Sequence, residues 1–267
     1  MGVRELEDRQ GTIRQILVIT DGCSNVGEDP IEAALRAHRK NVVVNVIGIV
    51  DKGDLGKQGR TEAMSIADAG GGMCRIVQTA ELSATAQMMT HQTMQMTLQQ
   101  VVNKQLLQVM GKTTEDLPPA ERTKVMQLME KMEEEIKLEL VVAIDTSASM
   151  RDKMALVKDA VRDLTLSLQA REGEALVAVI AFPGQQDDMV RTVQPFSSGL
   201  DMAALDGVWA ARGGTPTGPA LDYALELFKG AGQSASNAAD DLRAEDDLEV
   251  VEPNSDESGW TDLSQLS

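Results

Sequence analysis

Aromatic residues and cysteines are scarce in this sequence of 267 residues. Phe, Trp and Tyr together make up 2% of the chain, and there are two cysteines, Cys23 and Cys74. Two cysteines are too few for a disulfide scaffold, so we expect reduced thiols in a cytoplasmic protein. A core must therefore be built from aliphatic side chains and methionine, and the apolar fraction of 42% is large enough for one.

Long apolar runs are also missing. No segment approaches the roughly 18 consecutive apolar residues of a membrane-spanning helix. Residues 1–15 are polar and mixed in charge, without the apolar stretch of a signal peptide. We therefore expect no membrane association, and we interpret 1–15 as an N-terminal extension.

Basic residues are outnumbered, with 25 Lys and Arg against 42 Asp and Glu, for a net charge of -17. Nucleic acid is excluded as an expected partner, because phosphate binding needs clustered Lys and Arg. Basic proteins and divalent cations are the natural electrostatic partners. Residues 231–267 hold ten acidic residues and one basic residue. Such a composition predicts a disordered acidic tail, which we interpret as a solubilising extension in preference to an interaction segment.

Short β-branched and apolar runs alternate with helical segments along the rest of the chain. This alternation predicts an α/β fold, a doubly wound Rossmann-like sheet that is mostly parallel, with an antiparallel hairpin formed by its last two strands. In such folds, ligands bind beyond the carboxyl ends of the strands. The predicted strands are Ile16–Thr20, Val42–Val50, Met73–Gln78, Leu138–Ile144, Ala175–Phe182 and Met189–Pro195.

Three kinds of helical segment stand out between the strands. Asp29 followed by Pro30 predicts a capped helix start. Arg151–Gln169 carries apolar residues at spacings of three and four, which predicts an amphipathic helix. Glu81–Met110 and Glu121–Glu135 are rich in methionine. Their methionines could line an adaptable partner groove or pack in the core, and we favour packing.

Carboxylates and hydroxyls gather in three segments at predicted strand ends or adjoining loops. Asp145, Ser147 and Ser149 alternate directly after one strand, so an extended turn points all three side chains the same way. Thr215 lies in a Gly-Gly-Thr-Pro-Thr-Gly loop, and Asp21 follows the first strand. Oxygen donors of this kind suit a hard divalent cation such as Mg²⁺. Each segment alone is also explained by a turn or a helix cap, whereas their combination is more specific.

Together these segments resemble the metal-ion-dependent adhesion site (MIDAS) of von Willebrand factor A (VWA) domains. The resemblance covers roughly residues 16–79 and 138–229. It implies that Asp145, Ser147, Ser149, Thr215 and Asp21 hold Mg²⁺ or Mn²⁺. Residues 19–25, 70–76 and the Asp145 motif also resemble the small YabS-like VWA proteins of spore-forming bacteria.

The order of the motifs departs from the family. The segment Thr20-Asp21-Gly22 resembles a motif that is normally the last of the three in the family, but here it comes first. Residues 16–110 thus resemble the second half of a VWA domain and 137–230 the first half, with 111–136 as a helical connector. The simplest explanation is a circular permutation. Pairing of halves between two chains, as a swapped dimer, stays open. A fusion of two truncated domains is less attractive, because each half lacks strands that the other has.

The resemblance implies a binding module and not an enzyme. One open position on the metal would accept an Asp or Glu of a partner protein. A role as an accessory subunit of an ATPase or kinase is the alternative, although the chain has no P-loop of its own. A metal-dependent hydrolase using Asp145 and Asp21 is less favoured, because the motifs contain no obvious general base.

Overall fold

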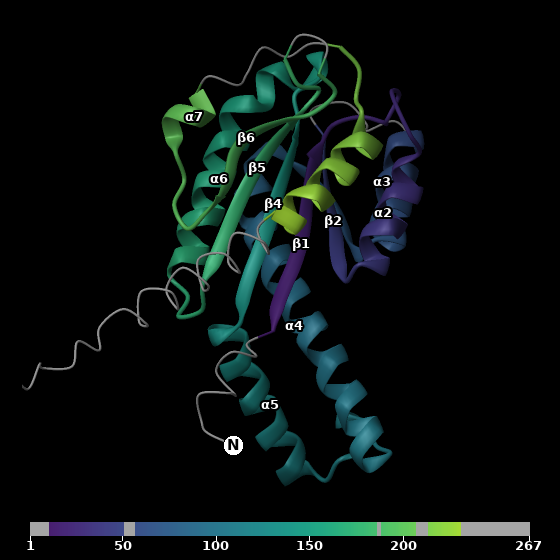
Figure 1. The fold of residues 1–267 in the computed structure, drawn as a ribbon, viewed down its shortest axis with the longest axis vertical. Coiled ribbons are helices and arrows are strands. Elements are labelled where there is room, and N and C mark those ends of the chain that lie inside the picture. Colours follow the sequence, from purple (N-terminus) through teal and green to yellow (C-terminus); the bar gives the residue numbers. More distant parts are fainter. Residues whose placement is uncertain (1–10, 51–56, 186–187, 207–212, 231–267) are drawn as a thin grey trace, which may run out of the picture. The chain divides into compact units, whose positions relative to one another are not determined.

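Six strands form a single mixed sheet in the order β3-β2-β1-β4-β5-β6 (Figure 1). The computed structural model describes residues 11–50, 57–185, 188–206 and 213–230. All neighbouring strands are parallel except the pair β5 and β6. The strands are β1 (Thr12–Thr20), β2 (Val42–Val50), β3 (Gly71–Gln78), β4 (Lys137–Asp145), β5 (Ala175–Phe182) and β6 (Arg191–Ser197).

Helices cover both faces of this sheet, which explains why its central strands are apolar on both sides. One face packs against α4 (Leu82–Met110) and α6 (Met154–Gln169), around core residues such as Leu17 and Val142. The opposite face packs against α2 (Pro30–Arg39), α3 (Lys57–Ala69) and a helix at 217–230. Short helical elements complete the fold: η1 (Thr79–Glu81), η2 (Thr114–Asp116), η3 (Ala148–Lys153) and α7 (Met202–Asp206).

The two halves of the sequence meet at the centre of the sheet. β1 pairs with β4 in parallel, with Val18 opposite Ala143 and Ile19 opposite Ile144. This pairing forms within one chain and needs no second copy. All six strands belong to one sheet, so the chain is not a fusion of two separate incomplete domains.

The predicted elements are found in the predicted places, with shifted ends. β1 begins at Thr12 and not at Ile16, so residues 12–15 of the supposed extension belong to the sheet. Their polar side chains hid this strand in the sequence. Arg14 pairs with Glu139 across the two central strands at 2.9 Å, and buried Gln15 donates to the carbonyl of Thr90 at 3.3 Å.

The amphipathic helix also starts later than predicted. η3 occupies Ala148–Lys153, and the regular α-helix begins at Met154. Its predicted apolar face is buried, as Val157, Val161 and Leu164 show. Asp29 caps α2 as expected, with its carboxylate accepting from the amide of Ile31 at 2.8 Å.

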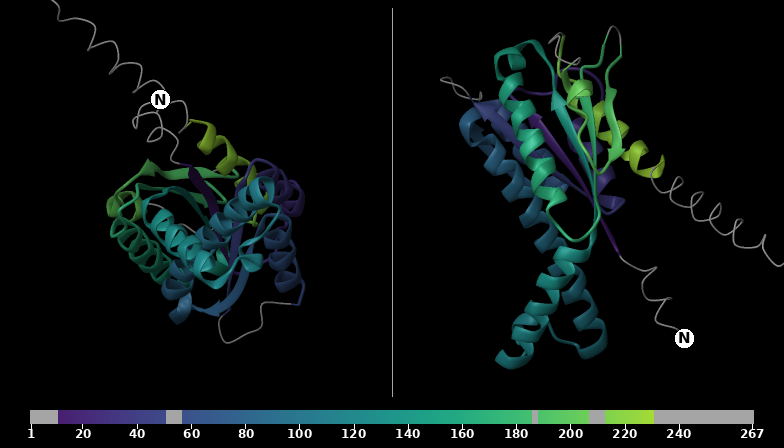
Figure 2. Two further views of the ribbon diagram at one scale, coloured as in Figure 1. Left: turned by 90° about the horizontal axis from the view of Figure 1, so that it is seen from below. Right: turned by 90° about the vertical axis from the view of Figure 1, so that its left-hand side faces the viewer.

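A helical arm extends beyond the amino ends of the strands (Figures 1 and 2). It consists of the second half of α4, η2 and α5 (Pro119–Glu135), which returns the chain to β4. We call residues 95–135 the α4–α5 arm. It coincides with much of the connector predicted at 111–136. Gly111 ends α4 in a left-handed conformation, with φ of 66°.

Some sequence predictions fall outside the described residues. They concern residues 1–10 of the expected N-terminal extension and the acidic tail at 231–267. Among the helices that the structure describes, none has both the length and the apolar character needed to cross a membrane.

Candidate functional site

The chain reverses its direction of travel across the sheet between β1 and β4. From β1 it proceeds outward to β2 and β3, then returns to β4 and proceeds to β5 and β6 on the other side. Ligands of open α/β sheets bind at such a switch point, beyond the carboxyl ends of the strands. The strand register brings Thr20 and Asp145, the last residues of β1 and β4, to this point.

Asp145 lies at the bottom of the site, with no exposed surface. Thr20 donates its hydroxyl to Oδ2 of Asp145 at 2.6 Å, a length typical of a bond to an ionised carboxylate. The backbone amide of Ser147 donates to Oδ1 at 2.8 Å. Both oxygens of this carboxylate are therefore held in place by neighbours on two strand ends.

A chain of hydrogen bonds runs from the Asp145 turn to Asp21. The hydroxyls of Ser147 and Ser149 are 3.1 Å apart, and Ser149 donates to Oδ1 of Asp21 at 2.7 Å. Asp21 and Asp145 are separated by more than a hundred residues in sequence, yet their side chains belong to one connected cluster. Four of the five predicted ligands are thus brought together.

Thr215 reaches the same end of the sheet through the loop that follows β1. The amide of Thr215 donates to the side-chain oxygen of Asn25 at 2.7 Å, and its carbonyl accepts from the amide of Asn25 at 3.2 Å and from the hydroxyl of Ser24 at 3.2 Å. Gly214 is required here, because a Cβ at that position would lie 2.4 Å from Asn25 Oδ1. Thr215 is 5% exposed, and its bonds to Ser24 and Asn25 tie it to the loop that follows Asp21.

A lysine completes the cluster. Lys153, at the end of η3, donates to Oδ2 of Asp21 at 2.6 Å and to the carbonyl of Ser149 at 3.3 Å. The Asp21 side chain is 3% exposed and that of Lys153 is 11% exposed, so this ion pair is shielded from water. Screening by solvent is weak at such a site, so the positive charge of the ammonium offsets much of the negative charge of Asp21.

Burial dominates the electrostatics of Asp145. It raises the pKa of this carboxyl from 3.8 to about 6, while hydrogen bonds from Thr20 and Ser147 act in the opposite direction. The negative charge of Asp21 also raises this pKa. Removal from water disfavours the charged form, and a neighbouring carboxylate adds to the cost. The cluster would therefore be stabilised by additional positive charge.

The donors at this edge match the spacing of a small cation's ligands. In an octahedral shell with oxygens at about 2.1 Å from the metal, adjacent oxygens lie about 2.9 Å apart. The 3.1 Å between the Ser147 and Ser149 hydroxyls and the 2.7 Å between Ser149 and Asp21 are close to that value. Within the described part of the chain, no three His, Cys, Asp or Glu side chains form a metal cluster. A cation here would depend on hydroxyl donors as well as carboxylates.

Sequence reasoning missed three residues of this site: Thr20, Asn25 and Lys153. Thr20 directly precedes Asp21, and its role followed from the strand register alone. Lys153 lies four residues after Ser149, one helical turn away, which was a usable signal. Asn25 contacts a loop about 190 residues away. Nothing local in the sequence indicates that contact.

Known proteins resemble this chain in sequence and fold. The family model of the von Willebrand factor type A domain matches residues 140–239. YabS of Bacillus subtilis (strain 168), an uncharacterised protein, is 38% identical over 240 residues, which cover 89% of this chain and 98% of YabS. The chain belongs to the VWA family. A crystal structure of an uncharacterised protein from Alicyclobacillus acidocaldarius is 67% identical. Its match covers 84% of this chain and 97% of that one, with a TM-score of 0.81.

The VWA family match extends over only part of the cluster. It begins within β4 and includes Asp145, Ser147, Ser149 and Thr215, whereas Asp21 precedes it. YabS, in contrast, matches over most of the chain.

Proposed function

We propose that this protein is a metal-dependent binding module for other proteins. Asp145, Ser147, Ser149, Thr215 and Asp21 hold one Mg²⁺ or Mn²⁺ ion. The observation that supports this most strongly is the hydrogen-bonded chain from Ser147 through Ser149 to Asp21, whose oxygens are spaced like adjacent ligands of an octahedral ion. The proposal assigns no catalytic residue to the chain.

We further propose that the chain is a circularly permuted VWA domain. The family match begins in β4, and Asp21, which is needed to complete the ligand set, lies directly after β1, the neighbour of β4 in the sheet. The α4–α5 arm would then be the connection that joins the original ends. The pairing of β1 with β4 within one chain supports a site to which a single copy contributes all ligands.

Several residues around the proposed ligands would hold those ligands in position. Thr20 and the Ser147 amide orient the buried Asp145 carboxylate, and Asn25 fixes the backbone of Thr215. When bound, the cation would supply a Lewis acid that attracts an oxygen ligand from outside. The natural external ligand is an exposed Asp or Glu of a partner, because its charge offsets the remaining positive charge of the ion.

Isothermal titration with MgCl₂ and MnCl₂ on EDTA-stripped protein tests the proposal. We expect one site per chain, lost in Ser149→Ala. Asp152→Asn is the matched control, because this exposed acid lies on η3 outside the hydrogen-bonded cluster. A wild-type protein that binds neither ion, or a Ser149→Ala variant that binds as well as Asp152→Asn, would refute it.

A further inference from the structure

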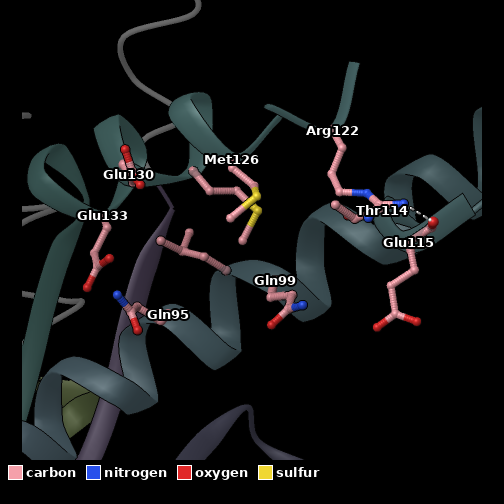
Figure 3. Close-up of a pocket in the computed structure, with 10 residues that line it drawn as sticks. Gln95, Gln99, Thr114, Glu115, Arg122, Met126, Glu130 and Glu133 are labelled. Carbon is pink, nitrogen blue, oxygen red and sulfur yellow. Dashed lines mark hydrogen bonds between the residues drawn. The ribbon is translucent and has the colours of Figure 1, made fainter. Parts of the chain in front are cut away.

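A groove runs along one side of the α4–α5 arm, at the opposite end of the strands from the candidate metal site. It consists of two adjoining hollows of about 330 Å³ and 560 Å³. Gln95, Glu130 and Glu133 line both hollows, so the two lie next to each other. Figure 3 shows the first, with the sulfur of Met126 lying between the two helices. Its volume and depth suit inserted side chains.

The floor of the groove is apolar and adaptable. Leu98 is buried at its base, while Met126 is 53% exposed and Met129 lines the wall beside it. Methionine is flexible and polarisable, so it fits partners of varied shape. The methionines of these helices therefore divide between two environments. Met89 and Met94 pack in the core, whereas Met126 faces a surface groove.

The rim of the groove is acidic. Five glutamates line the two hollows: Glu115, Glu130, Glu133, Glu134 and Glu172. His91 also lines the groove and contacts the carboxylate of Glu133.

Two arginines line the same hollows, but their guanidinium groups bind backbone carbonyls of this chain. Arg122 donates to the carbonyl of Glu115 (Figure 3) and to that of Leu117, and Arg171 donates to those of Glu133 and Ile136. These bonds tie together the turns at each end of α5. The arginines thus support the groove and keep their positive charge, but the five glutamates outnumber them, so the lining has an excess of negative charge.

We propose that this groove docks a basic amphipathic helix of a partner protein. The apolar side of that helix would contact Leu98, Met126 and Met129. Its Lys and Arg residues would lie against Glu115 and Glu130. A helix laid in a groove between two helices is an established mode of peptide recognition, and acidic, methionine-lined grooves favour basic helices.

Charge argues against the two other occupants that this chain could supply. Residues 231–267 carry a net charge of -9, so the chain's own C-terminal segment is repelled by an acidic rim. A second copy of the protein brings a net charge of -17. A basic partner, in contrast, is attracted over long range and steered to the groove.

The probe is a fluorescent peptide of about 18 residues, made of leucine and lysine with the leucines at helical spacing. A scrambled peptide of the same composition controls for charge alone. Anisotropy titrations use the full chain and two matched pairs of variants. Met126→Gln is paired with Leu128→Gln, because these side chains are 53% and 55% exposed but only Met126 lines the groove. Glu130→Gln is paired with Glu121→Gln, which removes the same charge from the same helix outside both hollows.

We expect Met126→Gln to weaken binding of the amphipathic peptide by about tenfold, since an apolar contact is lost. Glu130→Gln should weaken peptide binding by about threefold. The two control variants, Leu128→Gln and Glu121→Gln, should bind the peptide within about twofold of wild type. Binding should persist in EDTA, because no proposed metal ligand lines the groove. Equal effects within each pair, equal binding of the scrambled peptide, or loss of binding in EDTA would overturn the proposal.

Light scattering on the unliganded protein tests whether a second copy of the chain fills the groove instead. We expect a monomer whose mass is unaffected by Met126→Gln. A dimer that this substitution dissociates would show that a second copy fills the groove, and the proposal of a basic partner would be wrong.

Discussion

The carboxyl edge of β1 and β4 and the α4–α5 arm are built in opposite ways. At the carboxyl edge, short motifs place polar side chains, and strand register and hydrogen bonds fix each one. In the arm, two long helices pair without any motif, and the groove arises from how they lie together. If the two proposals are right, the first region recognises a kind of atom, a small divalent cation. The second would recognise a kind of surface, an apolar helix face flanked by basic residues, which many sequences can provide.

The largest effect that separates these regions should come from Asp145→Asn. The substitution keeps the shape of the side chain but removes the buried negative charge that the proposed cation requires. We expect Mg²⁺ affinity to fall by more than about 100-fold, beyond the 10- to 100-fold typical of groups that only orient ligands. Calorimetric titration measures this, and retention of wild-type affinity would contradict the assignment.

The same variant should have the reverse effect on stability in EDTA. Burial raises the pKa of Asp145 from 3.8 to about 6, so in this range the native state binds a proton that the unfolded state has released. Stability of the metal-free wild type thus falls as pH rises from about 4 to about 6, and Asn at this position removes that loss. Two pKa units correspond to about 3 kcal/mol, expected in full at pH 7.

Urea unfolding at pH 4, 5, 6 and 7 checks this expectation. The variant should be indistinguishable from wild type near pH 4 and should exceed it increasingly toward pH 7. A constant difference at all pH values would show that Asp145 has no perturbed titration.

A smaller effect at the same edge is expected from Lys153→Met. The ammonium of Lys153 neutralises Asp21 and occupies one of its two oxygens. Removing it should strengthen Mg²⁺ binding by about tenfold, the effect of one nearby charge partly screened by its surroundings. Lys158→Met, on α6 and bridged to Asp206, is the control and should leave affinity unchanged. Weaker binding in Lys153→Met would instead mean that Lys153 positions Asp21 for the metal.

The smallest effect at the metal site should come from the arm. Met126→Gln and Glu130→Gln, which are expected to weaken peptide binding, should leave Mg²⁺ affinity within about twofold of wild type. Their side chains contribute neither a ligand nor a hydrogen bond to the cluster. Titration of both variants with MgCl₂ checks the independence of the two regions, and a parallel loss of both activities would show that they are coupled.

Most of the fold could be predicted because local patterns agree with the tertiary structure. β2 was predicted to the residue, since a β-branched run buried on both faces leaves an unmistakable sequence pattern. β1 was predicted four residues short, because Arg14 and Gln15 are polar. Their partners, Glu139 and the carbonyl of Thr90, lie far away in sequence. A buried polar residue is recognisable only when its partner is known.

The residues of the candidate site show the same difference between local and long-range signals. Asp145, Ser147 and Ser149 could be identified because they share one turn, and Asp21 because it ends a strand. Asn25 could not, because its contact with Thr215 depends on how two loops meet. The groove lay beyond prediction as well. Which methionines face the core and which face solvent depends on where α5 lies against α4.

The most direct test of the central claim is a crystal structure of this chain soaked in MnCl₂, with anomalous diffraction recorded. The account predicts a single strong anomalous peak beside the hydroxyls of Ser147 and Ser149, coordinated with the help of residues from both halves of one chain. Absence of a peak at that position, or a peak that uses Asp145 of one chain and Asp21 of another, would contradict it.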